Sequence, residues 1–421
     1  MKRLLNAACA LFICASAHAS GFNTFFADST LRLDLILSGT HESVSVSLSR
    51  LHCKPGWAGR KTNLDSLLLK GSGDVTVVTA EGDTIYRNSF SSLFSEWLDL
   101  NPKENRAFQH SVTVPMPRST ATATVTLRDK RHNAIATSTF TIDPADILIK
   151  KDSRGALPHT YIHRGSFRGP KISVAILAEG YTESDMPLFI ADAKAAVKAL
   201  FSHKPFDEFR ERFDIIAVET PSDTTGVSTP KYADWRHTAF DSHFSTFYSD
   251  RYLTTPSVWA MHEACRGIPA EHFIILANSD EYGGGGIFNA YTLTSSRGTN
   301  FNNVVTHEFG HSFGGLADEY FYDGDVMDNT YPLDAEPWEP NITTLVDFDS
   351  KWKDMLADGT PQPTPTDLSM QYPVGLYEGG GYSFHGIYRP ADYCRMRVNN
   401  TDAFCPVCQR AIRKMIQFYT E

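Results

Sequence analysis

A His-Glu-x-x-His motif in THEFGHSFGGLADEYFYDG, residues 306–324, contains the residues best suited to chemistry. On a helix, His307 and His311 leave one face a turn apart, so both imidazoles can bind one metal ion. Zn²⁺ binds imidazole nitrogen readily, and a catalytic zinc site keeps one position open for water. Glu308 lies beside them, where it can take a proton from a zinc-bound water without binding the metal. The alternative is a solvated helix whose histidines are coincidental.

A third protein ligand is needed, and the helix itself does not supply it. If the helix continued past Gly315, Asp318 would lie on the His311 face but about 10 Å away, too far to share the ion. The paired glycines Gly314 and Gly315 permit a turn with positive φ that ends the helix and folds the chain back. Asp318 can then approach the metal.

The motif and its flanks resemble a family. In metzincin zinc proteases the third ligand is a histidine three residues after the glycine, but Ala317 stands there, which excludes an ordinary metzincin. The sequence is similar to the IgA peptidase family of bacterial zinc metallopeptidases, which combine HE-x-GH, a glycine turn and Asp-Glu-Tyr. The matching residues are His307, Glu308, Gly310, His311, Gly314, Asp318, Glu319 and Tyr320. ILAEGYT near residue 180 and CRM…FCPVC extend the resemblance over about residues 170–415, and the β-rich beginning is similar to the N-terminal domain often attached in that family.

This resemblance implies an exported, zinc-dependent endopeptidase that acts on protein or peptide substrates. Zn²⁺ would be bound by His307, His311 and Asp318, with Glu308 as the catalytic general base. Glu319 is the competing ligand, and a glutamate on a later helix is a further alternative. A different class of function is an exported binding or adhesion protein with a structural or inactive zinc site.

The resemblance to metzincins also implies a methionine beneath the zinc, for which Met396 in YCRMRVN is the candidate. The tyrosine that follows this methionine in some metzincins is missing. Tyr393, Tyr388 and His385 are therefore the candidates for stabilising the oxyanion, although each is also a plausible structural residue.

Two kinds of element must position these residues. Residues 20–145 contain alternating β-branched runs between turn residues, which predict a β-sandwich. Residues 146–170 are polar and predict a linker. From residue 171 to 421, apolar strand runs such as KISVAILAEGY alternate with helical stretches, which predicts an α/β domain. The family resemblance implies that this domain is zincin-like, with a metzincin-like fold. The fold class is therefore α+β.

The stretch GGGGIFNAYTLTSS, residues 283–296, predicts a flexible glycine loop followed by a strand. Because that strand precedes the zinc helix, we expect Ile287–Ser296 to be an edge strand that pairs with an extended peptide substrate.

Residues 1–19 have the charged start, apolar run and Ala-x-Ala end of a secretory signal peptide, so we expect an exported protein, secreted or periplasmic. The formal net charge is −10, or −12 without Lys2 and Arg3, which argues against nucleic-acid binding. No transmembrane segment is expected, and the oligomeric state is open. In an oxidising compartment, CRMRVNNTDAFCPVC predicts a disulfide involving Cys394. The less favoured alternatives for its Cys-Pro-Val-Cys are a thioredoxin-like redox pair and half a zinc knuckle. The acidic stretch DGDVMDN, residues 323–329, predicts a solvated loop.

Overall fold

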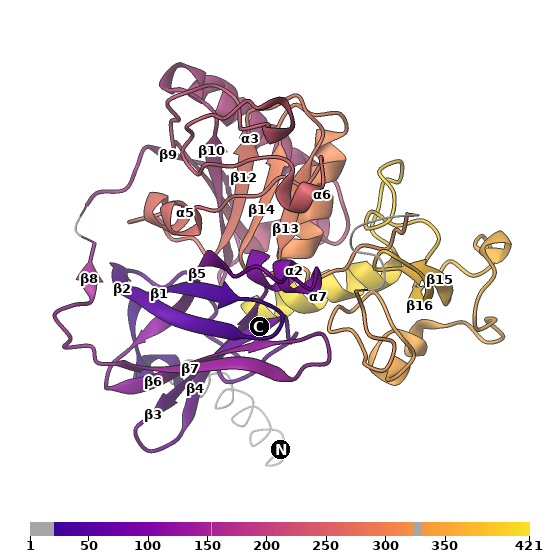
Figure 1. Ribbon diagram of the computed structural model, residues 1–421, viewed down its shortest axis with the longest axis horizontal. Helices are drawn as coiled ribbons and strands as arrows, with labels where there is room; N and C mark the ends of the chain where they lie inside the picture. The colour runs from indigo at the N-terminus through magenta and orange to yellow at the C-terminus, as the bar shows by residue number, and fades with distance from the viewer. Residues whose placement is uncertain (1–20, 153, 323–329) are drawn as a thin grey trace, which may run out of the picture.

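The computed structural model describes residues 21–152, 154–322 and 330–421. Its fold is mixed α+β, with four sheets among these residues (Figure 1). The predicted signal peptide, residues 1–19, and the acidic stretch at residues 323–329 lie outside the described residues. In the described part of the chain, no helix is both long enough and apolar enough to cross a membrane.

Residues 21–152, here called the N-terminal region, form two four-stranded sheets. The strand orders are β5-β1-β2-β8 and β4-β3-β6-β7. The strands are β1 (Phe26–Gly39), β2 (Val44–Pro55), β3 (Gly73–Thr79), β4 (Thr84–Phe90), β5 (Arg106–Pro117), β6 (Ala121–Arg128), β7 (Ala134–Ile142) and β8 (Lys150–Lys151). Buried side chains from both sheets share one hydrophobic core, for example Leu33 of β1 and Val125 of β6. Alternating apolar residues thus bring the two sheets together over one core.

A short helix that the sequence did not predict, α2 (Leu93–Asp99), follows β4. The Ser92 hydroxyl caps it by accepting a hydrogen bond from the Ser95 amide (3.1 Å), and Phe94 and Trp97 are buried. The helix lies on the side of the N-terminal region that meets the rest of the molecule (Figure 1). There the Tyr252 hydroxyl of the second part of the chain donates to the Glu96 carboxylate.

Residues 154–421, here called the C-terminal region, contain a six-stranded sheet with the order β13-β14-β12-β10-β11-β9. The strands are β9 (His159–Arg164), β10 (Ile172–Glu179), β11 (Phe213–Val218), β12 (His272–Ala277), β13 (Gly284–Ile287) and β14 (Tyr291–Ser295). The inner four run parallel, whereas β9 and β13 are antiparallel edge strands. Strands β8 and β9 fall in residues 146–170, so the expected linker contributes one strand to each region.

Helices cover both faces of this sheet. Every residue of β10 is buried, as its continuous apolar run requires for a strand covered on both faces. Three helices contribute to the core on one face: α3 (Met186–Leu200), α6 (Phe301–Ser312) and α7 (Pro406–Thr420). The short helix α5 (Val258–Ala264) contributes to the core on the other face.

The edge of the sheet differs from the prediction. The glycine stretch expected as a loop is the outer strand β13, and the expected edge strand is β14, which lies between β13 and β12. Glycines fit there because β13 lies directly against α6: a Cβ on Gly286 would come within 2.3 Å of the Glu308 carbonyl oxygen. Close backbone approach, not flexibility, explains this glycine run.

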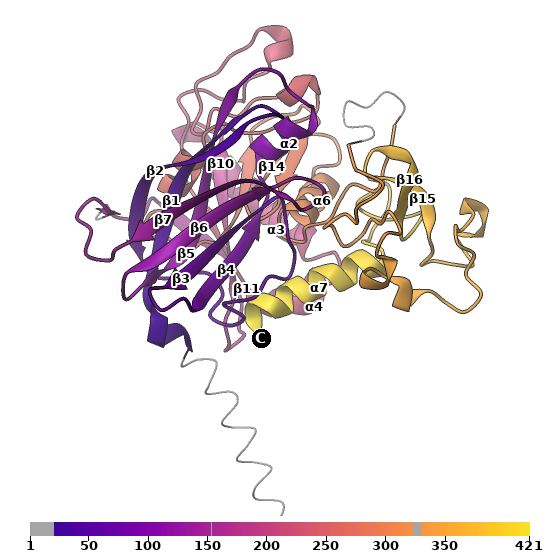
Figure 2. The same ribbon diagram turned by 60° about the horizontal axis from the view of Figure 1, so that its bottom comes forward.

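After α6 the chain forms an arm of loops and the hairpin β15 (Tyr377–Gly380) and β16 (Ser383–Arg389). It then returns through α7, which ends beside the N-terminal region (Figure 2). There the Asn63 side-chain amide donates to the Phe418 carbonyl (3.1 Å), and the Arg60 guanidinium lies 4.8 Å from the Phe418 ring centroid. The last helix thus links the arm, the six-stranded sheet and the N-terminal region.

Candidate active site

Helix α6 holds the two histidines of the motif with their Nε2 atoms 3.0 Å apart. The helix buries Val305 and Phe309 in the core and turns the histidines toward the cavity on the other side. Gly310, between them, allows close packing from below, because a Cβ there would come within 2.9 Å of the Met396 sulfur. Met396 is fully buried and lies beneath the helix, as the sequence suggested.

The paired glycines end α6 and bring the third residue back. Gly315 has φ +62°, and the Leu316 amide donates to the Gly310 carbonyl (3.2 Å). As a result Asp318 Oδ1 lies 3.1 Å from His307 Nε2 and 3.2 Å from His311 Nε2. The structure therefore brings together the three residues that the sequence selected as ligands.

Neighbouring groups orient all three side chains. Nδ1 of His307 donates to the Arg395 carbonyl (2.8 Å), and Nδ1 of His311 donates to the Leu316 carbonyl (2.6 Å). Because a carbonyl can only accept, each imidazole is left with Nε2 facing the centre of the cluster. The Tyr382 hydroxyl donates to Asp318 Oδ2 and leaves Oδ1 toward the same centre. Such contacts to the remote atoms of ligands are typical of metal sites.

These three side chains fit a metal ion. Tetrahedral ligands about 2.0–2.1 Å from zinc lie about 3.3 Å from one another, close to the 3.0–3.2 Å found here. Asp318 Oδ1 is buried and has no hydrogen-bond donor. Two imidazoles and one carboxylate are also a ligand set that zinc accepts. Among the described residues, no glutamate from a later helix joins this group.

Glu308 is buried between α6 and the edge strand β13. A Cβ on Gly284 would come within 2.6 Å of Glu308 Oε1, so the carboxylate lies directly beside this strand. Burial raises the pKa of Glu308, while the two neighbouring histidines act in the opposite direction. A buried carboxyl group with a raised pKa, next to a candidate metal site, is suited to accept and return a proton.

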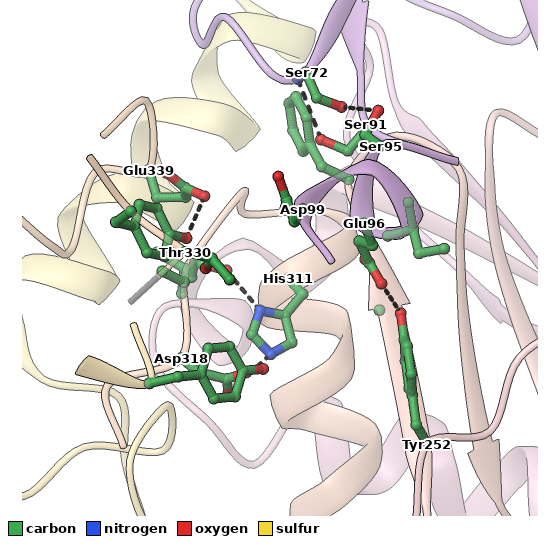
Figure 3. Close-up of a pocket in the computed structure, with 18 of the residues that line it drawn as sticks. Ser72, Ser91, Ser95, Glu96, Asp99, Tyr252, His311, Asp318, Thr330 and Glu339 are labelled. Atoms are coloured by element: carbon green, nitrogen blue, oxygen red, sulfur yellow. Dashed lines mark hydrogen bonds and ion pairs between the residues drawn. The ribbon is translucent and has the colours of Figure 1, made fainter. Parts of the chain in front are cut away.

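The cluster opens into a cavity of about 1220 Å³ that residues of both regions line. Helix α2 contributes Ser95, Glu96 and Asp99 to its wall (Figure 3). Burial raises the pKa of Glu96 to about 7, although the Tyr252 hydroxyl donates a hydrogen bond to its carboxylate. Sequence reasoning missed this wall, because α2 lies more than 200 residues before the motif and carries no local signal of the contact.

The residues expected to stabilise an oxyanion lie elsewhere. Tyr393, Tyr388 and His385 do not line the cavity; Tyr393 is 63% exposed, and His385 contacts Glu378. Three other residues line it, namely Arg251, Tyr320 and Tyr382. Tyr382 comes from GGGYSFHGIYRP, the same stretch that contains Tyr388 and His385.

The competing ligand, Glu319, points away from the histidines. Its Oε1 accepts hydrogen bonds from Cys408 Sγ (3.0 Å) and from the Asn341 side-chain amide (2.9 Å). The predicted disulfide is not formed, since Cys394, Cys405 and Cys408 are free thiols. Sγ of Cys394 and Sγ of Cys408 lie 3.7 Å apart, whereas a disulfide requires about 2.05 Å. The thiols form hydrogen bonds instead: Cys394 Sγ donates to Cys408 Sγ, which in turn donates to the Glu319 carboxylate.

Comparison with known families agrees with this arrangement. A family model described as IgA Peptidase M64 matches residues 162–372 and 366–416, which include the His–His–Asp cluster and the cysteines. A model described as Peptidase M64 N-terminus matches residues 21–139. No curated protein matches the chain. Since the matched stretches cover most of both regions, the chain belongs to the IgA peptidase M64 family and is a metallopeptidase, an enzyme that hydrolyses peptide bonds.

Proposed function

We propose that this metallopeptidase is an exported zinc endopeptidase with His307, His311 and Asp318 as zinc ligands and Glu308 as general base. The observation that carries the proposal is the convergence of two Nε2 atoms and one carboxylate oxygen within 3.2 Å, beside a buried carboxyl group. An open cavity on one side leaves room for substrate. A structural zinc site normally has four protein ligands and needs no such base beside it.

In this proposal a bound zinc ion would act as a Lewis acid, which would lower the pKa of a bound water and polarise the scissile carbonyl. Glu308 takes the proton of the attacking water and returns a proton to the leaving amine. Tyr382 and the carbonyls of Arg395 and Leu316 keep the three ligands oriented. Arg251 lies over the Tyr320 ring at 5.3 Å, which places a positive charge in the cavity wall close enough to interact electrostatically with Asp318 and Glu308.

The substrate is a protein or peptide that lies along β13, not along Ile287–Ser296 as first expected. The edge is only partly free, because the Gly284 amide and carbonyl already bond to Arg251 and Leu253 at 3.3 Å. Along β13, Gly286 is the next residue whose amide and carbonyl point away from β14, and it also lies beside Glu308. An extended peptide that pairs with Gly286 would therefore carry its scissile bond toward the candidate metal site.

We also propose a β-sandwich fold for the first part of the chain and a metzincin-like fold for the second. Two sheets over one core support a β-sandwich at residues 20–145, and a mostly parallel sheet with an antiparallel edge beside the motif helix supports a metzincin-like domain at residues 171–421. The apolar leader at residues 1–19 supports export.

Hydrolysis of unfolded casein tests the proposed function. We expect the purified wild type to cleave casein, and Glu308→Gln to lower the rate by a factor of about 10² to 10⁴, because the general base is lost. The variant should retain the wild-type zinc content and unfolding temperature. Equal activity in both proteins would show that Glu308 is not the base. No activity in either, with zinc bound, would favour the binding-protein alternative.

A further inference from the structure

A second cluster of metal-binding side chains lies buried behind the first. It consists of Glu319 and three cysteines, Cys394, Cys405 and Cys408, here called the cysteine cluster. Each of the four residues is at most 4% exposed, and their candidate ligand atoms all lie within 4.8 Å of one another. They come from three separate places: the segment after α6, the segment that carries Met396, and the first turn of α7.

The carboxylate of this cluster lacks a counter-ion. Glu319 Oε2 is buried and has no hydrogen-bond donor, while Oε1 accepts only from Asn341 and Cys408. Arg389 is close enough to interact electrostatically with Glu319, but its guanidinium contacts Asp392 and two backbone carbonyls instead. A buried carboxylate without a positive partner is strongly unfavourable, and a bound cation would supply that partner.

We propose that the cysteine cluster binds a second zinc ion with a structural role, coordinated by the three cysteine sulfurs and the Glu319 carboxylate. Three soft sulfur ligands favour zinc over calcium or magnesium, and four protein ligands make a closed tetrahedral site. Two thiolates about 2.3 Å from a tetrahedral zinc lie about 3.8 Å apart. The observed 3.7 Å between the sulfurs of Cys394 and Cys408 matches this separation.

The surrounding backbone also suits sulfur ligands. The Cys405 amide donates to Cys394 Sγ (3.3 Å), and the Cys408 amide donates to Cys405 Sγ (3.5 Å). Cys405 is the N-cap residue of α7, a helix of 15 residues, so the positive end of the helix dipole faces the sulfurs. Both effects favour the thiolate form that binds metal.

Such a site would fix the backbone of the active site. Glu319 directly follows Asp318, and its amide donates to the Met396 carbonyl (2.8 Å). The ion would therefore hold together the chain that carries Asp318, the segment beneath α6 and the start of α7. The inference does not depend on the role of Glu308 or on proteolytic activity.

Metal content of the full-length purified protein tests this inference. We expect two zinc ions per chain in the wild type, one in His307→Ala/His311→Ala, and one in Cys405→Ser. Cys265→Ser is the matched control, because Cys265 is buried and lies outside the cluster. It should retain two. One zinc in the wild type and none in the double histidine variant would overturn the proposal.

A second measurement covers the case in which Cys405→Ser does not fold. The double histidine variant, which keeps the cysteine cluster, is loaded with Co²⁺ in place of zinc. We expect a strong thiolate-to-cobalt charge-transfer absorption, which nitrogen and oxygen ligands alone do not give. Its absence in a variant that binds Co²⁺ would overturn the proposal. An intact mass two hydrogens lower, without reductant, would show a disulfide instead and would also overturn it.

Discussion

Two clusters of metal-binding side chains lie on either side of one short segment, and they differ in almost every physical respect. The His–His–Asp cluster has nitrogen and oxygen donors, only three candidate ligands and a cavity in front of it. The cysteine cluster has mainly sulfur donors, four candidate ligands and almost no exposure. Open coordination suits chemistry and closed coordination suits structure. In the proposed assignment, the neighbouring carboxylates of Asp318 and Glu319 would therefore belong to two metal sites with two different roles.

Asp318 and Glu319 are adjacent in the sequence, but their carboxylates point into different clusters. The Glu319 amide bonds to the Met396 carbonyl, while Asp318 is directed toward the histidines by Tyr382. Asn341 fixes the residue that precedes them: its side chain accepts from the Ala317 amide (2.7 Å) and donates to the Ala317 carbonyl (2.9 Å). Backbone anchoring together with the Tyr382 hydrogen bond therefore directs each carboxylate to its own cluster.

Selective metal removal should separate the two clusters most strongly. A small chelator such as 1,10-phenanthroline reaches the open cluster through the cavity, so we expect complete loss of casein hydrolysis. The cysteine cluster is sealed, so one zinc per chain and most of the thermal stability should remain. Activity, zinc content and unfolding temperature are measured on the same sample. Simultaneous loss of both ions would remove the distinction between an open and a closed site.

Asn341→Ala should affect both clusters together. It leaves the Ala317 amide without its side-chain partner and removes one of the two donors to Glu319 Oε1, so we expect about 3 kcal/mol less stability and weaker metal retention at both sites. Chemical unfolding and zinc analysis measure these effects. Asn278→Ala is the control: Asn278 is buried and donates to the Gly180 carbonyl, away from both clusters, so metal content should not change. Loss of only one ion in Asn341→Ala would show that the two sites are anchored separately.

Gly286→Ala should disturb the open cluster alone. The added Cβ would come within 2.3 Å of the Glu308 carbonyl oxygen and 2.8 Å of His311 Cβ, so β13 must move away from α6. We expect about 2 kcal/mol of destabilisation and reduced activity, with cysteine-bound zinc unchanged. Gly155→Ala is the matched control, since a Cβ on Gly155 meets nothing within 4 Å. Equal stability of the two variants would contradict the close packing of β13.

The smallest expected effect comes from Tyr382→Phe, which removes the hydroxyl that donates to Asp318 Oδ2. We expect about a tenfold loss of zinc affinity at the open site, because Asp318 keeps its position but loses its orienting partner. Competition with a chelator of known affinity gives the value. Tyr377→Phe, which removes a hydrogen bond from a buried tyrosine to the Tyr372 carbonyl, should leave zinc affinity unchanged. Equal affinity of Tyr382→Phe and wild type would assign Tyr382 to packing.

The local parts of this molecule could be predicted from the sequence. Helical spacing predicts that His307 and His311 lie on one helix face with Glu308 beside them. The glycine turn, together with the family resemblance, predicts that Asp318 returns to the two histidines. Most of the strands were also visible as alternating or continuous apolar runs, such as β1 and β10. These signals depend on neighbouring residues alone.

The predictions that differ from the structure concern contacts between segments that are distant in the sequence. The glycine run of β13 predicts a loop when it is considered alone. The glycines are needed because α6, which follows later in the sequence, packs directly against this strand. Glu96 reaches the cavity only because two regions pack together, and Glu319 meets Cys408 across 89 residues. The disulfide prediction rested on compartment and spacing, and neither shows that a carboxylate lies among the thiols.

The contacts of the turn between β13 and β14 also bear on how the two halves of the chain evolve. The Ser91 amide donates to the Phe288 carbonyl (2.8 Å), and the Asn289 side chain donates to the Ser89 carbonyl (2.8 Å). The edge strand beside Glu308 is thus anchored by the other half of the chain. A recombination event that joined this C-terminal half to a foreign N-terminal half would lose that anchor. We therefore expect selection to have kept the two halves together as one matched pair.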